Sequence, residues 1–500
     1  MSEHVDVLVV GAGLSGIGAG CHLTMECPDK SFAILESRDA IGGTWDLFRY
    51  PGIRSDSDMF TLGFPFRPWP DAKTIADGPS ILTYIKETAR EYGIEDKIRY
   101  HRRAVRASWS SDEALWTVDV ERTDSGGTEQ FTCNFLFMCS GYYRYDEGYT
   151  PDFAGRDNFR GEIIHPQHWP DDLDYSDKRI VVIGSGATAV TLIPSLAEQA
   201  AHVTMLQRSP TYVVSLPAID PLAGPLKRWL PARIANPLLK WKNVLLAMLS
   251  FQLSRRRPHI MKAIIRKGLE KSLPADFDID THFKPRYNPW DQRLCLVPDG
   301  DFFKVLSDGR ASVVTDTIDT FTETGIRLAS GSEVEADIII TATGLQMLAF
   351  GGLALTVDGD EIKLSEKVGY KGMMLSDVPN FAAAIGYTNA SWTLKCDLIC
   401  EYVCRLLNHM DKTGMRQVTP RWREATLPER PFVDLTSGYV LRSVQDFPKQ
   451  GERPPWRLFQ NYIRDVLMIR RGSLVDDAIE FSNPEPVTRA EPPTTERLTA

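Results

Sequence analysis

The chain has 500 residues, about three times the size of a common single domain, so two or three packed units are expected. Hydrophobic residues make up 43% of the sequence and charged residues 25%, which is typical of globular proteins and excludes collagen, coiled-coil and wholly disordered chains. The formal net charge of −9 argues against a nucleic-acid-binding protein, because such a domain carries a basic surface.

The cysteine content and the apolar runs of the sequence indicate the cellular compartment in which the protein is expected. Eight cysteines are too few for a disulfide framework, and none forms the C-x2-C pair of a zinc site. The first residues lack the basic and apolar regions of a signal peptide, and no run of about 18 uncharged apolar residues occurs. We therefore expect a reduced, cytoplasmic protein without a transmembrane helix or a metal site.

The first chemical motif follows a short apolar strand near the N-terminus. The strand 7–10 runs directly into Gly11-Ala12-Gly13-Leu14-Ser15-Gly16, and the next apolar strand, 31–35, ends at Glu36. In this pattern Gly11 makes a tight turn, Gly13 lets a pyrophosphate approach the backbone, and Gly16 packs the helix on the strand. Glu36 accepts hydrogen bonds from a ribose diol. The motif predicts a dinucleotide-binding βαβ unit.

A second copy of this pattern occurs later, with an informative difference. The strand 179–183 runs into Gly184-Ser185-Gly186-Ala187-Thr188-Ala189, and the strand 202–206 ends at Gln207-Arg208. Arg208 stands where the first copy has an acid, and a guanidinium binds a 2′-phosphate that a carboxylate would repel. The second nucleotide is therefore expected to be NADP(H). The alternative, an ordinary surface arginine, remains open.

Each unit closes with an apolar strand that ends in a small residue and a glycine, at 134–141 and at 337–344. The repeat predicts an α/β fold with two Rossmann-like dinucleotide-binding domains and an inserted α-helical subdomain. The expected limits are 1–142 and 342–482 for the first domain, 143–210 and 299–341 for the second, 211–298 for the insertion, and 483–500 for a disordered tail.

The insertion differs in charge from the rest of the chain. Residues 221–270 contain eleven Lys or Arg and one acid, a local charge of +10, around the apolar run 244–249. One interpretation is a pair of core-packed helices with a solvated basic face. The other is a helical surface that makes weak peripheral contact with a membrane, since basic amphipathic helices bind anionic lipid.

Two longer motifs carry a family resemblance. The segment from Gly42 to Asp56 matches the pattern A/G-G-x-W-x4-F/Y-P-G-x3-D at every fixed position, and Phe159 to Pro170 matches F-x-G-x3-H-x3-W-P/D. The chain thus resembles the Baeyer–Villiger-type flavin monooxygenases, and Trp169 favours this branch over the related N- and S-oxidising enzymes. Segments 45–59 and 288–298 look most like the ethionamide-activating subgroup.

The resemblance implies FAD and NADP(H) as cofactors and O2 as co-substrate. Reduced flavin would give a C4a-peroxide that inserts one oxygen atom beside the carbonyl of a small apolar ketone, forming an ester or lactone; sulfur in thioethers and thioamides is a further expected target. Arg293 matches the family's active-site arginine, which would stabilise the anionic peroxide. Asp56 matches the acid that would orient this arginine and contact the nicotinamide.

The resemblance also assigns binding residues. Those implied for FAD, beyond the glycine loop and Glu36, are Ser15, Thr44, Trp45, Asp46, Leu47, Asp56 and the backbone at Ala104. Those implied for NADP are Arg54, Ser55, Asp56, Gly184, Ser185, Gly186, Ala187, Thr188, Ala189, Gln207, Arg208 and Ser209. Many relatives have Lys before the active-site arginine, where this chain has Gln292, so NADPH preference would depend mostly on Arg208 and Ser209.

Three other functions stay open at this point. They are an N- or S-hydroxylating flavin monooxygenase without ketone activity, an NADPH oxidase that only releases H2O2, and a nucleotide-sensing module without redox chemistry. Among the remaining features, Cys396, Cys400 and Cys404 indicate one buried helix face, and His165 with Trp169 is expected to brace the interdomain linker. Residues 386–392 precede a helix whose N-terminus is a candidate for stabilising reduced flavin.

Overall fold

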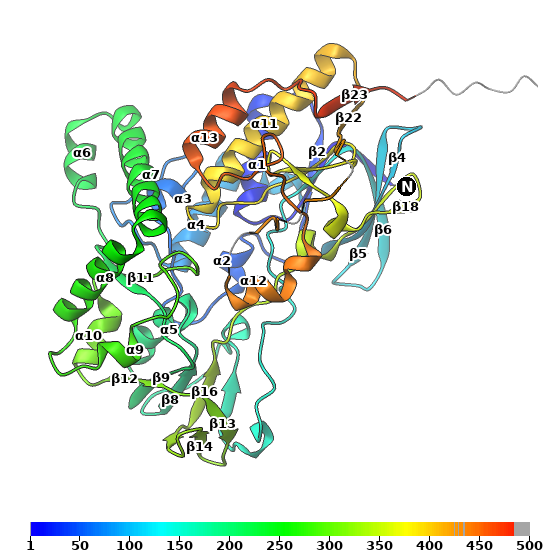
Figure 1. Cartoon of the computed structure of the whole chain (residues 1–500). Coiled ribbons are helices and arrows are strands. Elements are labelled where there is room, and N and C mark those ends of the chain that lie inside the picture. Colours follow the sequence, from blue (N-terminus) through cyan, green and yellow to red (C-terminus); the bar gives the residue numbers. More distant parts are fainter. Residues whose placement is uncertain (1, 425, 429, 434–435, 485–500) are drawn as a thin grey trace, which may run out of the picture.

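The computed structural model describes residues 2–424, 426–428, 430–433 and 436–484. Figure 1 shows one sheet in the upper part of the molecule, a second in the lower part, and a group of helices, α6 to α8, standing to one side of both. This arrangement confirms the predicted α/β fold with two dinucleotide-type sheets and a helical insertion. Most of the predicted tail, from residue 485 on, lies outside the described residues.

The larger sheet has the strand order β18-β17-β4-β5-β6-β1-β2-β3, and β21 also pairs with β6. Strand β1 runs parallel between β2 and β6, and its Val7, Leu8 and Val9 are fully buried because both faces of the sheet are covered. The strands are β1 (Glu3–Val10), β2 (Phe32–Leu35), β3 (Ile98–Arg99), β4 (Arg102–Ser110), β5 (Leu115–Arg122), β6 (Thr128–Met138), β17 (Ala354–Val357), β18 (Asp360–Glu361) and β21 (Phe381–Ala383).

The second sheet is wholly parallel, in the order β12-β9-β8-β16-β7. A small antiparallel sheet, β13-β14-β15, lies beside it. The strands are β7 (Glu162–Ile164), β8 (Arg179–Ile183), β9 (His202–Gln207), β12 (Ala311–Thr315), β13 (Ile318–Phe321), β14 (Gly325–Leu328), β15 (Glu333–Glu335) and β16 (Ile338–Thr341), with helices α5 (Ala187–Leu196) and α10 (Asp301–Ser307).

The insertion is helical, as predicted, and a short parallel pair of strands, β10 and β11, frames it in the sequence. Within the apolar run 244–249 only Val244 is buried, whereas Leu245, Leu246 and Leu249 are exposed. No helix in the described part of the chain has the length and apolarity needed to cross a bilayer. The elements are β10 (Val213–Leu216), α6 (Ala223–Trp229), α7 (Ala232–Arg256), α8 (Pro258–Ser272), α9 (Ile279–His282) and β11 (Cys295–Pro298).

The long helix α11 packs on the first helix, α1. Its Cys396, Cys400 and Cys404 are all buried, which confirms the predicted stripe, and the Cys27 thiol donates to the Cys404 carbonyl. The remaining elements are α1 (Leu14–Glu26), α2 (Thr44–Leu47), α3 (Met59–Leu62), α4 (Gly78–Glu91), α11 (Trp392–Thr413), α12 (Gly438–Ser443), α13 (Tyr462–Val466), β19 (Gly369–Tyr370), β20 (Met374–Leu375), β22 (Gln417–Pro420) and β23 (Ile479–Ser482).

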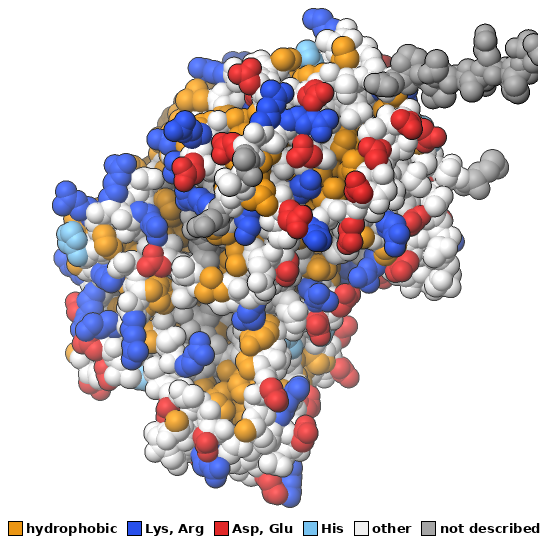
Figure 2. Space-filling model, turned by 45° about the vertical axis from the view of Figure 1, so that its right-hand side comes forward, with side chains coloured by type: hydrophobic (Ala, Val, Ile, Leu, Met, Phe, Trp, Pro, Cys, Tyr) orange, Lys and Arg blue, Asp and Glu red, His pale blue; other side chains and the backbone are white. Residues whose placement is uncertain are grey.

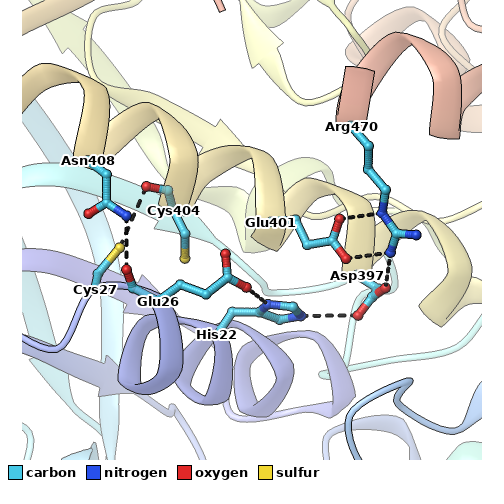
Figure 3. A network of polar contacts seen from close by, with 8 residues as sticks. All are labelled: His22, Glu26, Cys27, Asp397, Glu401, Cys404, Asn408 and Arg470. Carbon is cyan, nitrogen blue, oxygen red and sulfur yellow. Dashed lines mark hydrogen bonds and ion pairs between the residues drawn. The ribbon is translucent and has the colours of Figure 1, made fainter. Parts of the chain in front are cut away.

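A polar network joins α1 to α11 (Figure 3). His22 places Nδ1 2.6 Å from Glu26 Oε1 and Nε2 3.0 Å from Asp397 Oδ1, and Arg470 extends the network to Asp397 and Glu401. Burial alone would lower the pKa of His22, but the two carboxylates raise it to about 9. His22 is therefore a cation at neutral pH that ties the first helix to α11.

Candidate active site

The first glycine loop forms one end of a cavity of about 390 Å³. Gly11 has φ +106°, and a Cβ there would lie 2.7 Å from the Cys139 carbonyl oxygen, so only glycine fits. A Cβ on Gly16 would lie 1.8 Å from the Gly11 carbonyl oxygen, as expected where a helix packs closely on its strand. Gly13 has φ −77° and lines the cavity, so its backbone is open to a ligand.

Glu36 lies at the carboxyl end of β2, as the motif requires, and is buried. Its Oε2 accepts a hydrogen bond from the Ala12 amide at 2.8 Å and its Oε1 one from the Arg38 amide at 2.9 Å. Oε1 also accepts from the Ser37 hydroxyl at 3.4 Å, whereas Oε2 has a second lone pair with which the fixed carboxylate can accept a hydrogen bond from a ribose. Ser140 also lines the cavity, and its buried hydroxyl has no hydrogen-bond partner among the described residues.

The other residues predicted to contact FAD divide into two groups. Asp46 and Leu47 do not line the cavity: Asp46 pairs with Arg38 at 2.7 Å, and Leu47 packs against the core of the second domain. The Ser15 hydroxyl accepts a hydrogen bond from Trp392 Nε1 at 2.8 Å, which fixes the start of α1 against the start of α11. The residues predicted for FAD that line the cavity are Gly11, Gly13, Ser15, Glu36, Thr44, Trp45, Asp56 and Ala104, and Arg54 and Ser55, predicted for NADP, line it too.

The two predicted catalytic residues meet at the far wall of this cavity. Arg293 Nε lies 2.7 Å from Asp56 Oδ2, although 237 positions separate the residues in the sequence. The neighbouring Asp58 has a different task, since it caps α3 through the Thr61 amide. The Asp56 carboxylate raises the pKa of Arg293 beyond its ordinary value against the effect of burial, so the guanidinium is a permanent cation.

Three tyrosines surround this cation, and no sequence motif singled them out. Tyr142 and Tyr143 follow β6 with their hydroxyls 3.1 Å apart, and Tyr439 comes from α12, near the other end of the chain. Burial raises the pKa of all three phenols, so they are neutral. Arg293 is thus a single fixed positive charge in a largely aromatic wall.

The second glycine loop lies at the surface. Gly184 has φ +131°, and its Cβ would lie 2.3 Å from the Ala342 carbonyl oxygen, whereas a Cβ on Gly186 would meet nothing. Arg208 is exposed, and its side chain makes no hydrogen bond or ion pair within the described residues. Gln207 is different, because its amide points inward and donates to the His282 carbonyl and the Thr315 hydroxyl.

The remaining residues predicted to bind NADP lie in three places. Ala187 and Thr188, at the start of α5, also line the first cavity, whereas Ala189 is buried in the core of the second domain. The Ser185 hydroxyl is 2.7 Å from Thr211 Oγ1, and Ser209 is exposed beside Arg208. Arg54 is already paired with Asp301 of α10, a contact that sequence reasoning did not anticipate.

The two family motifs lie where the two domains meet. Gly52 has φ +78°, and a Cβ there would lie 2.3 Å from Ser195 Oγ, so glycine lets this loop rest on α5. His165 donates from Nε2 to the Gly344 carbonyl at 3.2 Å and accepts from the Gln167 amide at Nδ1. Burial lowers the pKa of His165, which keeps it neutral for these roles. His165 thus braces the linker, as expected.

A second cavity, of about 840 Å³, adjoins the first. Asp56 and Arg293 line both cavities, so the ion pair stands at their junction. The wall of the second cavity is mostly apolar and comes largely from α7 and α8 of the insertion. The buried polar atoms of its lining residues that have no hydrogen-bond partner in the described residues are Thr74 Oγ1, Trp290 Nε1, Asn389 Oδ1 and Ser391 Oγ. The helix N-terminus predicted after residues 386–392 lies beside it, since α11 begins at Trp392.

Comparison with known proteins agrees with this geometry. Residues 5–368 match the model of the flavin-binding monooxygenase-like family. The chain belongs to this family. It is 56% identical over 489 residues to the FAD-containing monooxygenase EthA of Mycobacterium tuberculosis, covering 97% of this chain and 100% of that protein. The resemblance to flavin monooxygenases drawn from the motifs is thereby confirmed.

Solved structures share the fold of this family member. A steroid monooxygenase bound to NADP has a TM-score of 0.74 at 21% identity, covering 96% of this chain and all of that one. Cyclohexanone monooxygenase from Rhodococcus sp. Phi1, bound to NADP+, has a TM-score of 0.71 at 19% identity, covering 97% of this chain and all of that one. At these identities the likeness concerns the fold.

Proposed function

We propose that this family member is an FAD- and NADPH-dependent monooxygenase that inserts one oxygen atom of O2 beside the carbonyl of an apolar ketone. The observation that carries the proposal is the Arg293–Asp56 pair at the junction of a nucleotide-sized cavity and a larger apolar one. A fixed cation at such a junction suits a reaction that builds negative charge on oxygen.

The first cavity suits the flavin dinucleotide. Gly13 and the N-terminus of α1 would hold the pyrophosphate. Glu36 would accept hydrogen bonds from the ribose hydroxyls, and the buried hydroxyl of Ser140 would find its hydrogen-bond partner on the ligand. Bound flavin, once reduced, supplies the activation of O2 and the transfer of one oxygen atom. The α5 helix would hold the NADPH pyrophosphate at its N-terminus, and Arg208 would bind the 2′-phosphate.

Arg293 acts through the nitrogens that Asp56 leaves available. Asp56 forms its ion pair with Arg293 through Nε, while Nη1 and Nη2 make no hydrogen bond to the described residues. These two groups can donate to an anionic oxygen and later to the substrate oxygen that gains charge. The neutral tyrosines and the apolar second cavity replace part of the water around the ion pair, which weakens the screening of the interaction.

An aerobic assay with NADPH and a panel of ketones, thioethers and thioamides tests the proposal. We expect ester or lactone from at least some ketones. Sulfur oxidation with no ketone product would instead assign the N- or S-oxidising branch. NADPH consumption fully matched by H2O2 would indicate an oxidase, and a flavin that NADPH does not bleach anaerobically would indicate a sensing module.

Replacing Arg293 tests the role of the cation directly. In Arg293→Ala, reduction of the flavin by NADPH should slow at most moderately, because hydride transfer does not need a cation for the reacting oxygen. Ester formation should be lost, with H2O2 in its place. Arg90→Ala, an exposed arginine on α4, is the matched control and should behave as the wild type. Ester production by Arg293→Ala near the wild-type rate would refute the assignment.

A further inference from the structure

The insertion exposes an unusual amount of apolar surface. Twelve of the seventeen exposed large apolar side chains in the described residues lie between residues 216 and 264, which is about a tenth of the chain. Trp229 is 78% exposed, Leu249 66% and Leu246 57%. Single exposed apolar side chains need no explanation, but a contiguous group of this kind marks an interaction surface.

On α7 these side chains follow one face of the helix. Ile234, Leu238, Trp241, Leu245 and Leu249 are separated by four, three, four and four residues, the spacing of a single stripe along an α-helix. Ile260 and Ile264 repeat the four-residue spacing on α8. The set Ile234, Leu238, Trp241, Leu245, Leu249, Ile260 and Ile264 is called the apolar stripe below.

Basic side chains flank the apolar stripe. Residues 221–270 contain eleven Lys or Arg and one acid, in a chain of net charge −9. Some of these cations are neutralised, as Lys242 is by Asp220, but Arg233, Arg256, Arg257 and Lys267 are exposed and make no ion pair within the described residues. Figure 2 shows Lys and Arg side chains gathered along the left edge of the molecule, with apolar side chains between them.

We propose that the apolar stripe and its flanking cations dock on the surface of an anionic lipid bilayer. Apolar side chains in one plane lower their free energy when they enter the region between headgroups and acyl chains. Each basic residue near anionic headgroups raises the partition constant of the protein onto the membrane by about fivefold. A second copy of the chain is a poorer occupant, because a symmetric contact would bring the two basic faces together.

The second cavity connects this surface to the active site. Ile264 of the apolar stripe is exposed and also lines the cavity, as do the exposed Leu216, Leu222 and Leu246, so the rim of the cavity adjoins the docking surface. The inner wall reaches Arg293 and Asp56. An apolar ketone dissolved in the bilayer would then enter the second cavity from the membrane side without crossing water. This route for the substrate, unlike the docking itself, rests on the proposed function.

Sedimentation of the full-length holoprotein with vesicles tests the docking. One set of vesicles is phosphatidylcholine alone and the other contains equal parts of phosphatidylcholine and phosphatidylglycerol. We expect binding only to the anionic vesicles, lost in about 0.5 M salt, where the Debye length falls to a few ångström. Equal binding to both vesicle types, or binding to neither, would overturn the proposal.

Paired variants separate the apolar and the charged contributions. Leu245→Ser with Leu249→Ser, and separately Arg256→Glu with Arg257→Glu, should each weaken vesicle binding at least tenfold. The matched controls are Leu427→Ser with Leu441→Ser, and Lys86→Glu with Lys412→Glu, which alter exposed residues elsewhere and should bind as the wild type. Test variants that bind as tightly as their controls would overturn the proposal.

Two further readouts keep the docking distinct from the catalytic proposal. Leu245 and Leu249 do not line the second cavity, so their variant should oxidise a water-soluble ketone at the wild-type rate. Vesicle binding without any ketone oxidation would support the docking and refute the proposed function. Ketone oxidation without vesicle binding would support the function and refute the docking. A wild-type dimer that the leucine variant converts to a monomer, without vesicle binding, would assign the stripe to a second copy.

Discussion

The two glycine loops follow the same backbone plan in very different surroundings. At both loops the first glycine has a positive φ and lies against a carbonyl oxygen of a neighbouring strand end, from Cys139 or Ala342. Beyond that point they diverge, since Gly13 lines a cavity and is close to Gly43, whereas Gly186 faces open space. Glu36 is buried and held by two amides, while Arg208 is exposed without a partner in the described residues.

This difference matches the demands of a two-cofactor reaction. A flavin stays bound through many turnovers, so a cavity with a preorganised carboxylate suits it. A nicotinamide nucleotide must leave after each hydride transfer, so an open site with a single charged contact suits it. Four substitutions can break or sharpen this comparison.

The largest effect is expected from adding a methyl group to the first loop. In Gly11→Ala the Cβ would overlap the Cys139 carbonyl at a φ that favours glycine, a combination that should cost about 3 kcal/mol or more. We expect most of the flavin to be lost from the purified protein, measured by its visible absorbance.

The matched change in the second loop is Gly186→Ala. The added Cβ meets no atom and the backbone there has φ −78°, so folding and flavin content should match the wild type. Only KM for NADPH should rise, because the methyl group obstructs the approach of a phosphate. If Gly11→Ala kept a full complement of flavin, the contrast between the two loops would be wrong.

A smaller effect concerns the network behind the first loop, which ties α1 to α11. The pKa of His22 is raised to about 9, so the stability it contributes is complete below its ordinary pKa of about 6.5 and is lost as pH rises through 9. The contribution is up to about 3 kcal/mol. Urea unfolding of the wild type and of His22→Gln should therefore give free energies that converge between pH 6.5 and 9.5. Parallel curves would exclude this role.

Features that depend on neighbouring residues could be predicted from the sequence. Each glycine loop follows its strand and precedes its helix directly, so turn, strand and helix are fixed locally, and the structure has both as expected. Arg293 and Asp56 are brought together by the tertiary fold alone, and only the family resemblance indicated that they meet. Their roles in catalysis stay predictions.

Contacts set by tertiary packing could not be predicted from the sequence. Tyr439 reaches Arg293 from a helix about 150 positions later, and nothing local marks it. Asp46 is predicted to contact the flavin, and its ion pair with Arg38 joins residues that no motif linked. Gln207 stands beside Arg208 in the sequence, but Gln207 is the last, buried residue of β9, whereas Arg208 follows the end of the strand and is exposed.

The substitution with the smallest expected effect, at Arg208, tests whether this side chain binds the 2′-phosphate of the nucleotide at the open site. Loss of one charge-assisted contact costs about 1.5–3 kcal/mol, so KM for NADPH should rise roughly 10- to 150-fold in Arg208→Ala. KM for NADH should change little, because NADH lacks the phosphate. Flavin content should be unchanged, since Arg208 lies outside the first cavity. Lys86→Ala, an exposed cation on α4, serves as the control. An equal rise of KM for both nucleotides would mean that Arg208 supports the loop and does not discriminate between them.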